Sequence, residues 1–277
     1  MAERLFLRLD GDPLYAPETT VPGGTMREFA VLPALRSHVS NLAVYRETIP
    51  AGQEVVERVL PDGAVHLIFQ RGAPARAAGP VAAPVMLTFR GRMDGLSVTL
   101  RPGAAAAVLG VPPAEIAGSA VALGDLWGDD ALEQIAQAPT DAARVALLQR
   151  ALQQRLRVHD PSVAQRQAAQ AVKLIAEAGG QRALRDVADA VGVGERRLQQ
   201  IFRAEVGLSP GVWSRLSRLH ACLRALRQLQ APHWANLALD AGFYDQSHLV
   251  NEFRSLCGLT PRQFVAHAVS GSSNTQG

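Results

Sequence analysis

The chain is poor in cysteine and in aromatic residues. It has two cysteines in 277 residues, and aromatic residues make up 5% of it. Cys222 and Cys257 have no further Cys or His nearby at the spacing of a zinc ligand set, so we expect no metal site and no cofactor. Each cysteine falls on the apolar side of a predicted helix. This placement favours a buried structural thiol over a redox or alkylation sensor, which remains the alternative.

Long apolar runs are also missing. No stretch approaches the length that a membrane-spanning helix needs. The N-terminal segment MAERLFLRLDGDPL has an early acidic residue and lacks the apolar centre of a signal peptide. We therefore expect a cytoplasmic protein without a membrane partner.

Common catalytic motifs are absent from the sequence. It contains no HExxH, no glycine-rich phosphate loop ending in Lys-Ser or Lys-Thr, and no Gly-x-Ser-x-Gly elbow. A DNA-repair-type enzyme that transfers alkyl groups would need a reactive cysteine in the first half, where there is none. We therefore expect no enzyme.

Lysine is nearly absent, with Lys173 alone, so the positive charge is carried by arginine. The formal net charge is +3. From Pro161 onward there are 13 Arg and Lys against 8 Asp and Glu, whereas the preceding part is slightly acidic. Modest basicity confined to the second half suits sequence-directed DNA binding better than a coating of nucleic acid.

One short pattern is present twice in that basic half. The copies read VADAVGVGERRLQQIFRAEVGLSP (187–210) and LALDAGFYDQSHLVNEFRSLCGLTP (237–261). Gly192 aligns with Gly242 and Leu198 with Leu249, and the second copy has one extra residue between its glycine and its leucine. Each copy predicts a short helix, a glycine turn and a second helix, which is the outline of a helix-turn-helix.

The burial pattern of both copies follows from helical spacing. In the first copy we expect Gly192 to adopt a positive φ and end a helix, because glycine tolerates that conformation. Asp245 is a good N-cap for the second helix of copy two, and Gly194 is a weaker one in copy one. The residues expected to be buried are Val187, Ala188, Val191, Leu198, Ile201 and Phe202 in copy one, and Leu249, Phe253 and Leu256 in copy two.

A single amphipathic helix is predicted between the copies. Its apolar residues recur every three or four positions from Val212 to Gln230, and Pro232 ends it. Ser209 and Thr260 each precede a proline as capping residues, and Thr260 with Gln263 fits a capping box. Such a helix would hold the two units at a fixed separation.

The stretch GFYDQSHLVNEFRSLCGLTPRQF (242–264) resembles the signature of the AraC/XylS transcriptional regulators, and the likeness extends over roughly residues 165–267. This resemblance implies two helix-turn-helix units joined by a long helix, which enter successive major-groove segments of double-stranded promoter DNA. It implies a sequence-specific transcription regulator that also contacts RNA polymerase. Gly194 departs from the family, whose members often have a serine cap there.

The resemblance and the side-chain chemistry together give candidate DNA contacts. Arg, Gln and Asn match the edges of guanine and adenine, whereas phosphate contacts position a protein without reading sequence. Exposed polar residues on a helix equally fit a solvated face, and that alternative remains open. The base-reading candidates are Arg196, Gln199, Gln200, Gln246, Ser247 and Asn251, and the phosphate-contacting candidates are Arg203, His248 and Arg254.

The first half has the pattern of a β-rich domain. Turn signals at Pro61-Asp62-Gly63 and Asp94-Gly95 separate short runs rich in β-branched residues, which predict a barrel or a sandwich. Residues 72–84 are of low complexity and predict a loop with little to pack. Pro102–Gly128 predicts two short helical pieces divided by Pro112-Pro113. The predicted strands are Asn41–Ile49, Glu54–Leu60, Ala64–Gln70, Val85–Gly91 and Leu96–Pro102.

These observations predict an α+β chain with a mainly β N-terminal domain and an all-α C-terminal domain, and the resemblance to the AraC/XylS family implies that the N-terminal domain is cupin-like. We expect a sensor or dimerisation domain at 1–128, a helical linker at 129–164, the DNA-binding domain at 165–268 and a disordered tail at 269–277. From the linker into the start of the DNA-binding domain, Asp141–Arg157 and Pro161–Ala178 are predicted to be helical.

The segments LPDGAVHLIF and LRPGAAAAVLGVPPAEI resemble the sensor-like domain that precedes some AraC-type domains. In the wider family such domains bind a small-molecule effector or pair subunits, so an effector and a second copy of the chain are expected partners. His66 could line a pocket and Arg90, Arg92 and Arg101 could meet an anion, but packing, turn formation and solvation are the favoured explanations of these residues and of Asp62. No ligand-binding residue is assigned. An architectural DNA-binding protein that senses nothing remains an alternative.

Overall fold

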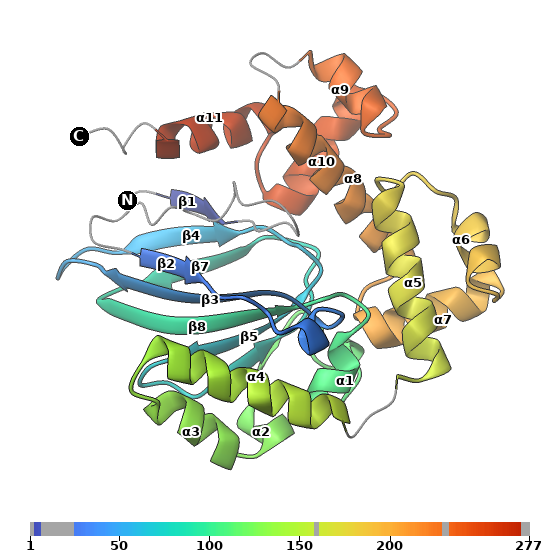
Figure 1. Cartoon of the computed structure of the whole chain (residues 1–277). Helices are drawn as coiled ribbons and strands as arrows, with labels where there is room; N and C mark the ends of the chain where they lie inside the picture. The colour runs from blue at the N-terminus through green and yellow to red at the C-terminus, as the bar shows by residue number, and fades with distance from the viewer. Residues whose placement is uncertain (1–2, 7–24, 158–160, 229–232, 273–277) are drawn as a thin grey trace.

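The computed structural model describes residues 3–6, 25–157, 161–228 and 233–272. Strands and short helices occupy the N-terminal half, and the described residues from 163 onward form helices and their connections (Figure 1). The predicted α+β class, with a sheet-rich N-terminal domain and an all-α C-terminal domain, is confirmed.

The described strands form two sheets. Pairing within the sheets is antiparallel except between β1 and β4. Among the described residues the two sheets share no paired strands, so the domain is an open sandwich rather than a closed barrel. The large sheet has the order β2 (Thr25–Glu28), β3 (Val39–Thr48), β8 (Arg92–Leu100), β5 (Val65–Gln70), β6 (Arg76–Ala78) and β9 (Ala120–Ala122). The small sheet has the order β1 (Glu3–Phe6), β4 (Val55–Val59) and β7 (Val85–Phe89).

The apolar core of this domain lies on one face of the large sheet. Along β5, Val65, Leu67 and Phe69 alternate toward that face, as a half-buried strand requires. Leu96 and Val98 of β8 lie beside them and are fully buried. Four helices cover the face (Figure 1): α1 (Ala105–Leu109), α2 (Gly124–Trp127), α3 (Asp130–Gln137) and α4 (Asp141–Arg157).

The prediction of a turn at Asp94-Gly95 is wrong, because both residues lie inside β8. The Asp94 carboxylate accepts a hydrogen bond of 3.0 Å from Nη1 of Arg144, a residue of α4 that is itself buried. Gly95 faces the Tyr45 ring, where a Cβ would lie 2.1 Å from Tyr45 Cζ. The reversal before β8 is at Gly91, which has a φ of +64°. Asp94 and Gly95 resemble a turn dipeptide in the sequence, but in the structure Asp94 forms a buried ion pair and Gly95 lies against the Tyr45 ring.

The segment 72–84 is also more ordered than predicted. It contains β6, which pairs with β5 on one side and with β9 on the other. Ala77 is fully buried, and a Cβ at Gly79 would lie 1.9 Å from the carbonyl oxygen of Ile116. Small residues let two backbone segments approach closely here, so the loop prediction was wrong. The two predicted helical pieces of 102–128 are α1 and α2, and a 3₁₀ turn, η3 (Pro113–Glu115), lies between them together with β9.

The space between the two sheets is lined by charged residues. Arg4 on β1 donates to Glu47 of β3 at 2.7 Å and 2.9 Å and to Glu57 of β4 at 2.6 Å, so it bridges the sheets. Burial raises the pKa of Glu57, and the charge of Arg4 acts in the opposite direction. The Arg4 ion pairs thus lie on the face of the large sheet opposite to its apolar core, whereas the Asp94–Arg144 pair lies on the face that α4 covers.

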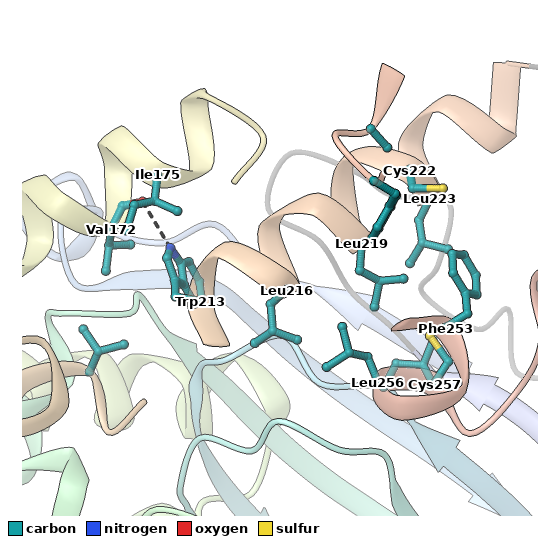
Figure 2. Packing of buried hydrophobic residues seen from close by; sticks show 14 of the residues in the cluster. Val172, Ile175, Trp213, Leu216, Leu219, Cys222, Leu223, Phe253, Leu256 and Cys257 are labelled. Carbon is teal, nitrogen blue, oxygen red and sulfur yellow. Dashed lines mark hydrogen bonds between the residues drawn. The ribbon is translucent and has the colours of Figure 1, made fainter. Parts of the chain in front are cut away.

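The C-terminal helices share a second apolar core. Figure 2 shows its centre, where Trp213, Leu219 and Leu223 of the long helix α8 lie between residues of α5 and of α10. The helices are α5 (Val163–Glu177), α6 (Leu184–Ala190), α7 (Glu195–Val206), α8 (Pro210–Gln228), α9 (Trp234–Asp240), α10 (Gln246–Cys257) and α11 (Pro261–Ser272).

Both predicted helices, Asp141–Arg157 and Pro161–Ala178, are present as α4 and α5. α4 packs on the N-terminal sheet through Leu148 and Leu152, whereas α5 packs in the C-terminal core through Val172 and Ile175. The division into domains at 128 and 164 stays a prediction. α11 extends to Ser272, into the segment for which we predicted disorder. Pro232, the predicted end of α8, lies outside the described residues.

Candidate nucleic-acid interface

The first helix-turn-helix unit is formed by α6 and α7. Gly192 has a φ of +74°, and the N–H of the next residue, Val193, donates a hydrogen bond to the Ala188 carbonyl at 3.0 Å. The glycine conformation and this hydrogen bond end α6 and direct the chain into α7. Leu198 and Phe202 are fully buried against the core, as predicted from their spacing.

The second unit repeats this construction with α9 and α10. Gly242 has a φ of +79°, and Phe243 N–H donates to the Ala238 carbonyl at 2.8 Å. Leu249 and Phe253 are fully buried, again as predicted. Both predicted units are therefore present with equivalent turn geometry.

The two recognition helices begin differently. Asp245 Oδ1 accepts a hydrogen bond from His248 N–H at 2.7 Å, so the predicted N-cap of α10 is confirmed. The N-cap of α7 is Gly194, which supplies no side-chain acceptor. One orphan amide at the start of α7 therefore lacks the side-chain partner that α10 has.

Helix α8 holds the two units together. Trp213 Nε1 donates to the Val172 carbonyl of α5 at 3.2 Å (Figure 2). At the other side, Arg215 donates to Glu252 at 2.8 Å and to Ser255 at 3.0 Å, both on α10. Helix α8 thus bonds to α5 and to α10 of the second unit, and it also contacts α7 of the first unit.

Capping residues fix the starts of α8 and α11. Ser209 Oγ accepts a bond of 3.2 Å from Val212 N–H, and Pro210 is the first residue of α8. The predicted capping box is present, because Thr260 N–H donates to Gln263 at 2.8 Å and Gln263 N–H donates to Thr260 Oγ1 at 3.3 Å. Both start signals that follow the repeated units are thus confirmed.

The candidate contact residues lie on the sides of α7 and α10 that the core does not use. All are exposed except His248, which is half-buried. Its Nδ1 accepts from Tyr244 N–H at 3.2 Å, so in the neutral ring the proton is on Nε2. The exposed candidates are Arg196, Gln199, Gln200 and Arg203 of α7 and Gln246, Ser247, Asn251 and Arg254 of α10.

The structure adds two features that the sequence reasoning missed. Tyr244 precedes the cap of α10 and is 86% exposed. A hollow of about 170 Å³ lies beside α10 and is bounded by Trp234, Gln246 and Arg262. The extra residue in the second copy of the repeat was the available signal for Tyr244.

The N-terminal domain contacts α8 through the connection between β4 and β5. Leu60 is buried among the residues of the C-terminal core. His220 Nε2 lies 3.1 Å from the Pro61 carbonyl, to which it donates as a neutral ring. A Cβ at Gly63 would lie 2.3 Å from Trp213 Cζ3, so the backbone there is in close contact with the tryptophan. Burial lowers the pKa of His220 to about 4.

The same domain also reaches the C-terminal ends of both recognition helices. Gly207 ends α7, and a Cβ there would lie 2.6 Å from Pro80 Cγ and 3.1 Å from the Pro113 carbonyl oxygen. Arg58 Nη1 donates to the Cys257 carbonyl, at the end of α10, at 3.3 Å. The two helices are thus touched by one domain at equivalent ends.

The histidine and arginine residues considered for a ligand have structural partners. His66 bonds with Asp62 at 3.1 Å and with Thr99 at 3.3 Å. Burial lowers the pKa of His66, but the charge of Asp62 and the hydrogen bond to it together outweigh burial and raise this pKa. Arg90 pairs with Glu54 at 2.6 Å. Arg92 is largely exposed and Arg101 donates to the Arg36 carbonyl at 2.8 Å.

Both cysteines are fully buried in the C-terminal core, as predicted. Burial raises the pKa of each thiol to about 12. Figure 2 places Cys222 on α8 and Cys257 on α10 among leucine and phenylalanine side chains. They act as small apolar residues of the core.

None of the helices in the described ranges is long and apolar enough to cross a bilayer.

Residues 187–267 match the family of helix-turn-helix domains, and this range begins in α6 and ends in α11. The C-terminal domain is an AraC-type helix-turn-helix domain. Residues 27–122 match a second family, described as a domain of unknown function (DUF6597). The AraC-type domain belongs to a DNA-binding class of transcription regulators.

No curated protein matches the chain. Solved structures with an AraC-type domain are similar to parts of it. A transcriptional regulator from Chromobacterium violaceum is 24% identical over 41% of this chain and 96% of its own, with a TM-score of 0.34. ToxT from Vibrio cholerae is 10% identical over 82% of this chain and 97% of its own, with a TM-score of 0.40. ToxT bound to an unsaturated fatty acid is 9% identical over 81% and 94%, with a TM-score of 0.39.

Proposed function

We propose that this chain is a one-component transcription regulator that acts in the cytoplasm and reads promoter DNA with α7 and α10 in successive major-groove segments. The observation that carries the proposal is the pair of equivalent helix-turn-helix units, both contacted by α8. A helix-turn-helix places the N-terminal residues of its recognition helix against base edges. Two such helices contacted by one shared helix suit a site with two subsites on one face of DNA.

The exposed side chains of the two helices are proposed to form two groups, one that contacts base edges and one that contacts phosphates. Arg196, Gln199 and Gln200 on α7 are proposed to read bases, because their paired donors and acceptors match guanine and adenine. Gln246, Ser247 and Asn251 are proposed to do so on α10. Arg203, Arg254 and the Nε2 of His248 are proposed to bind phosphates and set the register of the protein on the duplex.

The N-terminal domain is proposed to modulate DNA binding through its contacts with the AraC-type domain. It touches α8 at Trp213 and His220 and the ends of α7 and α10 at Gly207 and Cys257. An effector or a second copy of the chain that binds the N-terminal domain would shift these contacts if it prefers one arrangement of the domains. RNA polymerase is the further partner proposed for a regulator of this type.

The roles of individual residues are tested by fluorescence anisotropy, with a duplex that carries the site the full chain selects from genomic fragments and with duplexes of random sequence. Arg196→Ala and Gln246→Ala should each cost about 1–3 kcal/mol at particular base pairs and relax the preference there. Arg203→Ala should weaken binding to every sequence alike and lower the salt slope by about one. Arg150→Ala, at an exposed position of α4, is the matched control for loss of one positive charge. Equal losses on specific and random DNA for the first two variants would refute the assignment of base readers.

An architectural DNA-binding protein without an effector is the second candidate. It predicts that the wild-type protein binds all duplexes with similar affinity at moderate salt. A preference of 10-fold or less for any selected sequence would favour it over a regulator, whose specificity ratio is roughly 10³ or more.

A further inference from the structure

The two helix-turn-helix units differ by one residue in the turn, and the structure identifies that residue. In the first unit, Gly192 and Val193 are followed directly by the N-cap of α7. In the second unit, Gly242 and Phe243 form the equivalent backbone bonds, and one more residue precedes the N-cap. The inserted residue is Tyr244.

The backbone of Tyr244 is held firmly, whereas its side chain is exposed. Its N–H donates to His248 Nδ1 at 3.2 Å, and the His248 ring stacks edge-on against Phe243 with centroids 5.5 Å apart. Asp245 caps the same turn of α10. The side chain itself is 86% exposed, and its hydroxyl forms no hydrogen bond with the part of the chain that the structure describes.

The first unit has nothing comparable at this place. Its N-cap, Gly194, has no side chain, and a Cβ there would meet no atom within 4 Å. The tip of the first turn is therefore bare, and the tip of the second carries a large amphipathic ring. A tyrosine on a fixed backbone loses little conformational entropy when a partner covers it.

We infer that Tyr244 is a DNA contact that donates its hydroxyl to a phosphate oxygen beside the second recognition helix. The inference rests on the proposed function, because it requires α10 to enter the major groove. In that orientation the N-terminal end of α10 points toward the DNA, and the residue before its cap lies at the rim of the groove, where the sugar–phosphate backbone runs. Tyrosine is among the side chains that bind phosphates.

A neutral phosphate contact differs measurably from an arginine contact. Arginine releases condensed counterions, so its loss changes the dependence of affinity on salt. Tyrosine has no charge to exchange. Loss of the Tyr244 hydroxyl should therefore lower the affinity by the same factor at every salt concentration. The factor should also be independent of the base sequence next to the contacted phosphate.

The experiment measures the Kd of the full chain for its selected site by fluorescence anisotropy at several salt concentrations. Tyr244→Phe removes only the hydroxyl, and Tyr244→Ala removes the ring as well. Leu239→Ala on α9 is the matched control, because Leu239 is a large side chain of the same unit that is 61% exposed. All three variants should keep the wild-type melting temperature, since none removes a buried group.

We expect Tyr244→Phe to weaken binding about 10-fold, as the loss of one hydrogen bond to a charged group does, and Tyr244→Ala to weaken it further. The salt slope should be unchanged, and Leu239→Ala should bind like wild type. If the wild type binds tightly and the Kd of both Tyr244 variants is within twofold of its Kd, this inference is overturned and the proposed function is not. Reduced transcription activation with unchanged affinity would also overturn it and would indicate a polymerase contact. A wild-type protein that binds no DNA would overturn the proposed function together with the inference.

Discussion

Gly63 offers a direct perturbation of the contact between the two domains. It has a φ of +72°, and a Cβ there would lie 2.3 Å from Trp213 Cζ3 and 2.8 Å from Cε3. Gly63→Ala therefore adds two costs, the strain of the left-handed backbone and the clash with a ring of the AraC-type domain. Gly52→Ala is the matched control, because Gly52 has a φ of +81° and nothing within 4 Å of the added atom.

The magnitudes of the two costs can be separated. A left-handed conformation costs a residue with a Cβ about 1–2 kcal/mol, which both variants should lose. Overpacking of a tight contact costs about 1–3 kcal/mol more, which only Gly63→Ala should lose. We therefore expect Gly63→Ala to lower the free energy of unfolding by about 2–5 kcal/mol and Gly52→Ala by about 1–2 kcal/mol.

The assay is urea denaturation monitored by circular dichroism, with DNA affinity measured on the same preparations. If the clash is relieved by separation of the domains, the radius of gyration of Gly63→Ala should also rise in small-angle scattering. Equal losses of stability in the two variants, with unchanged scattering, would show that Gly63 does not contact Trp213 and would refute the docked arrangement. A change in DNA affinity confined to Gly63→Ala would support modulation through this contact.

Three further predictions concern the AraC-type domain. Asp245→Ala should lower the free energy of unfolding by about 0.5–2 kcal/mol, because it removes the N-cap of α10. Gly194→Ser should raise this free energy by roughly a few tenths of a kcal/mol, because it supplies an N-cap to α7. Thermal melts would show either change, and unchanged melting of both variants would contradict the cap assignment. Because burial lowers the pKa of His220 to about 4, the unfolded chain binds more protons between pH 6.5 and pH 4, so stability should fall across that window as the pH drops. The loss attributable to this histidine is about 3 kcal/mol, and His220→Gln should lack it in denaturation series at each pH. Cys222 and Cys257 should resist a thiol reagent at pH 8 until the protein unfolds, because burial raises the pKa of both to about 12, and rapid labelling of the native protein would contradict their placement.

The helix-turn-helix units could be predicted from the sequence because their determinants are local. A glycine that needs a positive φ, a capping aspartate and an apolar spacing of three or four residues all act within about 20 residues. Gly192, Asp245 and Phe253 therefore have the roles that the sequence indicates. The five longer strands, β3, β4, β5, β7 and β8, were predictable for the same reason, since a run rich in β-branched and aromatic residues is a local signal.

The features of the fold that could not be predicted depend on contacts between residues far apart in the sequence. Asp94 reads as a turn residue because its partner Arg144 lies 50 positions further on. Ala77 in β6 gave no strand signal, because its packing relies on smallness and not on apolar bulk. Pro61 and Gly63 look like an ordinary turn, and their contacts with α8 become visible only when both domains are placed.

The candidate site divides in the same way. The exposed faces of α7 and α10 follow from helical periodicity, so the candidate contact residues could be named in advance. The extra residue of the second copy was visible in the alignment, but the exposure of the Tyr244 ring depends on how Phe243 and His248 hold the turn. The contacts of the N-terminal domain with Gly207 and Cys257 had no signal in either copy.

The central claim is that two recognition helices read one DNA site together. It is tested most directly by selecting genomic fragments with the purified full chain, washing at moderate salt and sequencing what remains bound. The account predicts an enriched motif with two subsites about one helical turn apart, roughly 10 base pairs between centres. An enriched motif with a single subsite, or bound DNA without any motif, would contradict it.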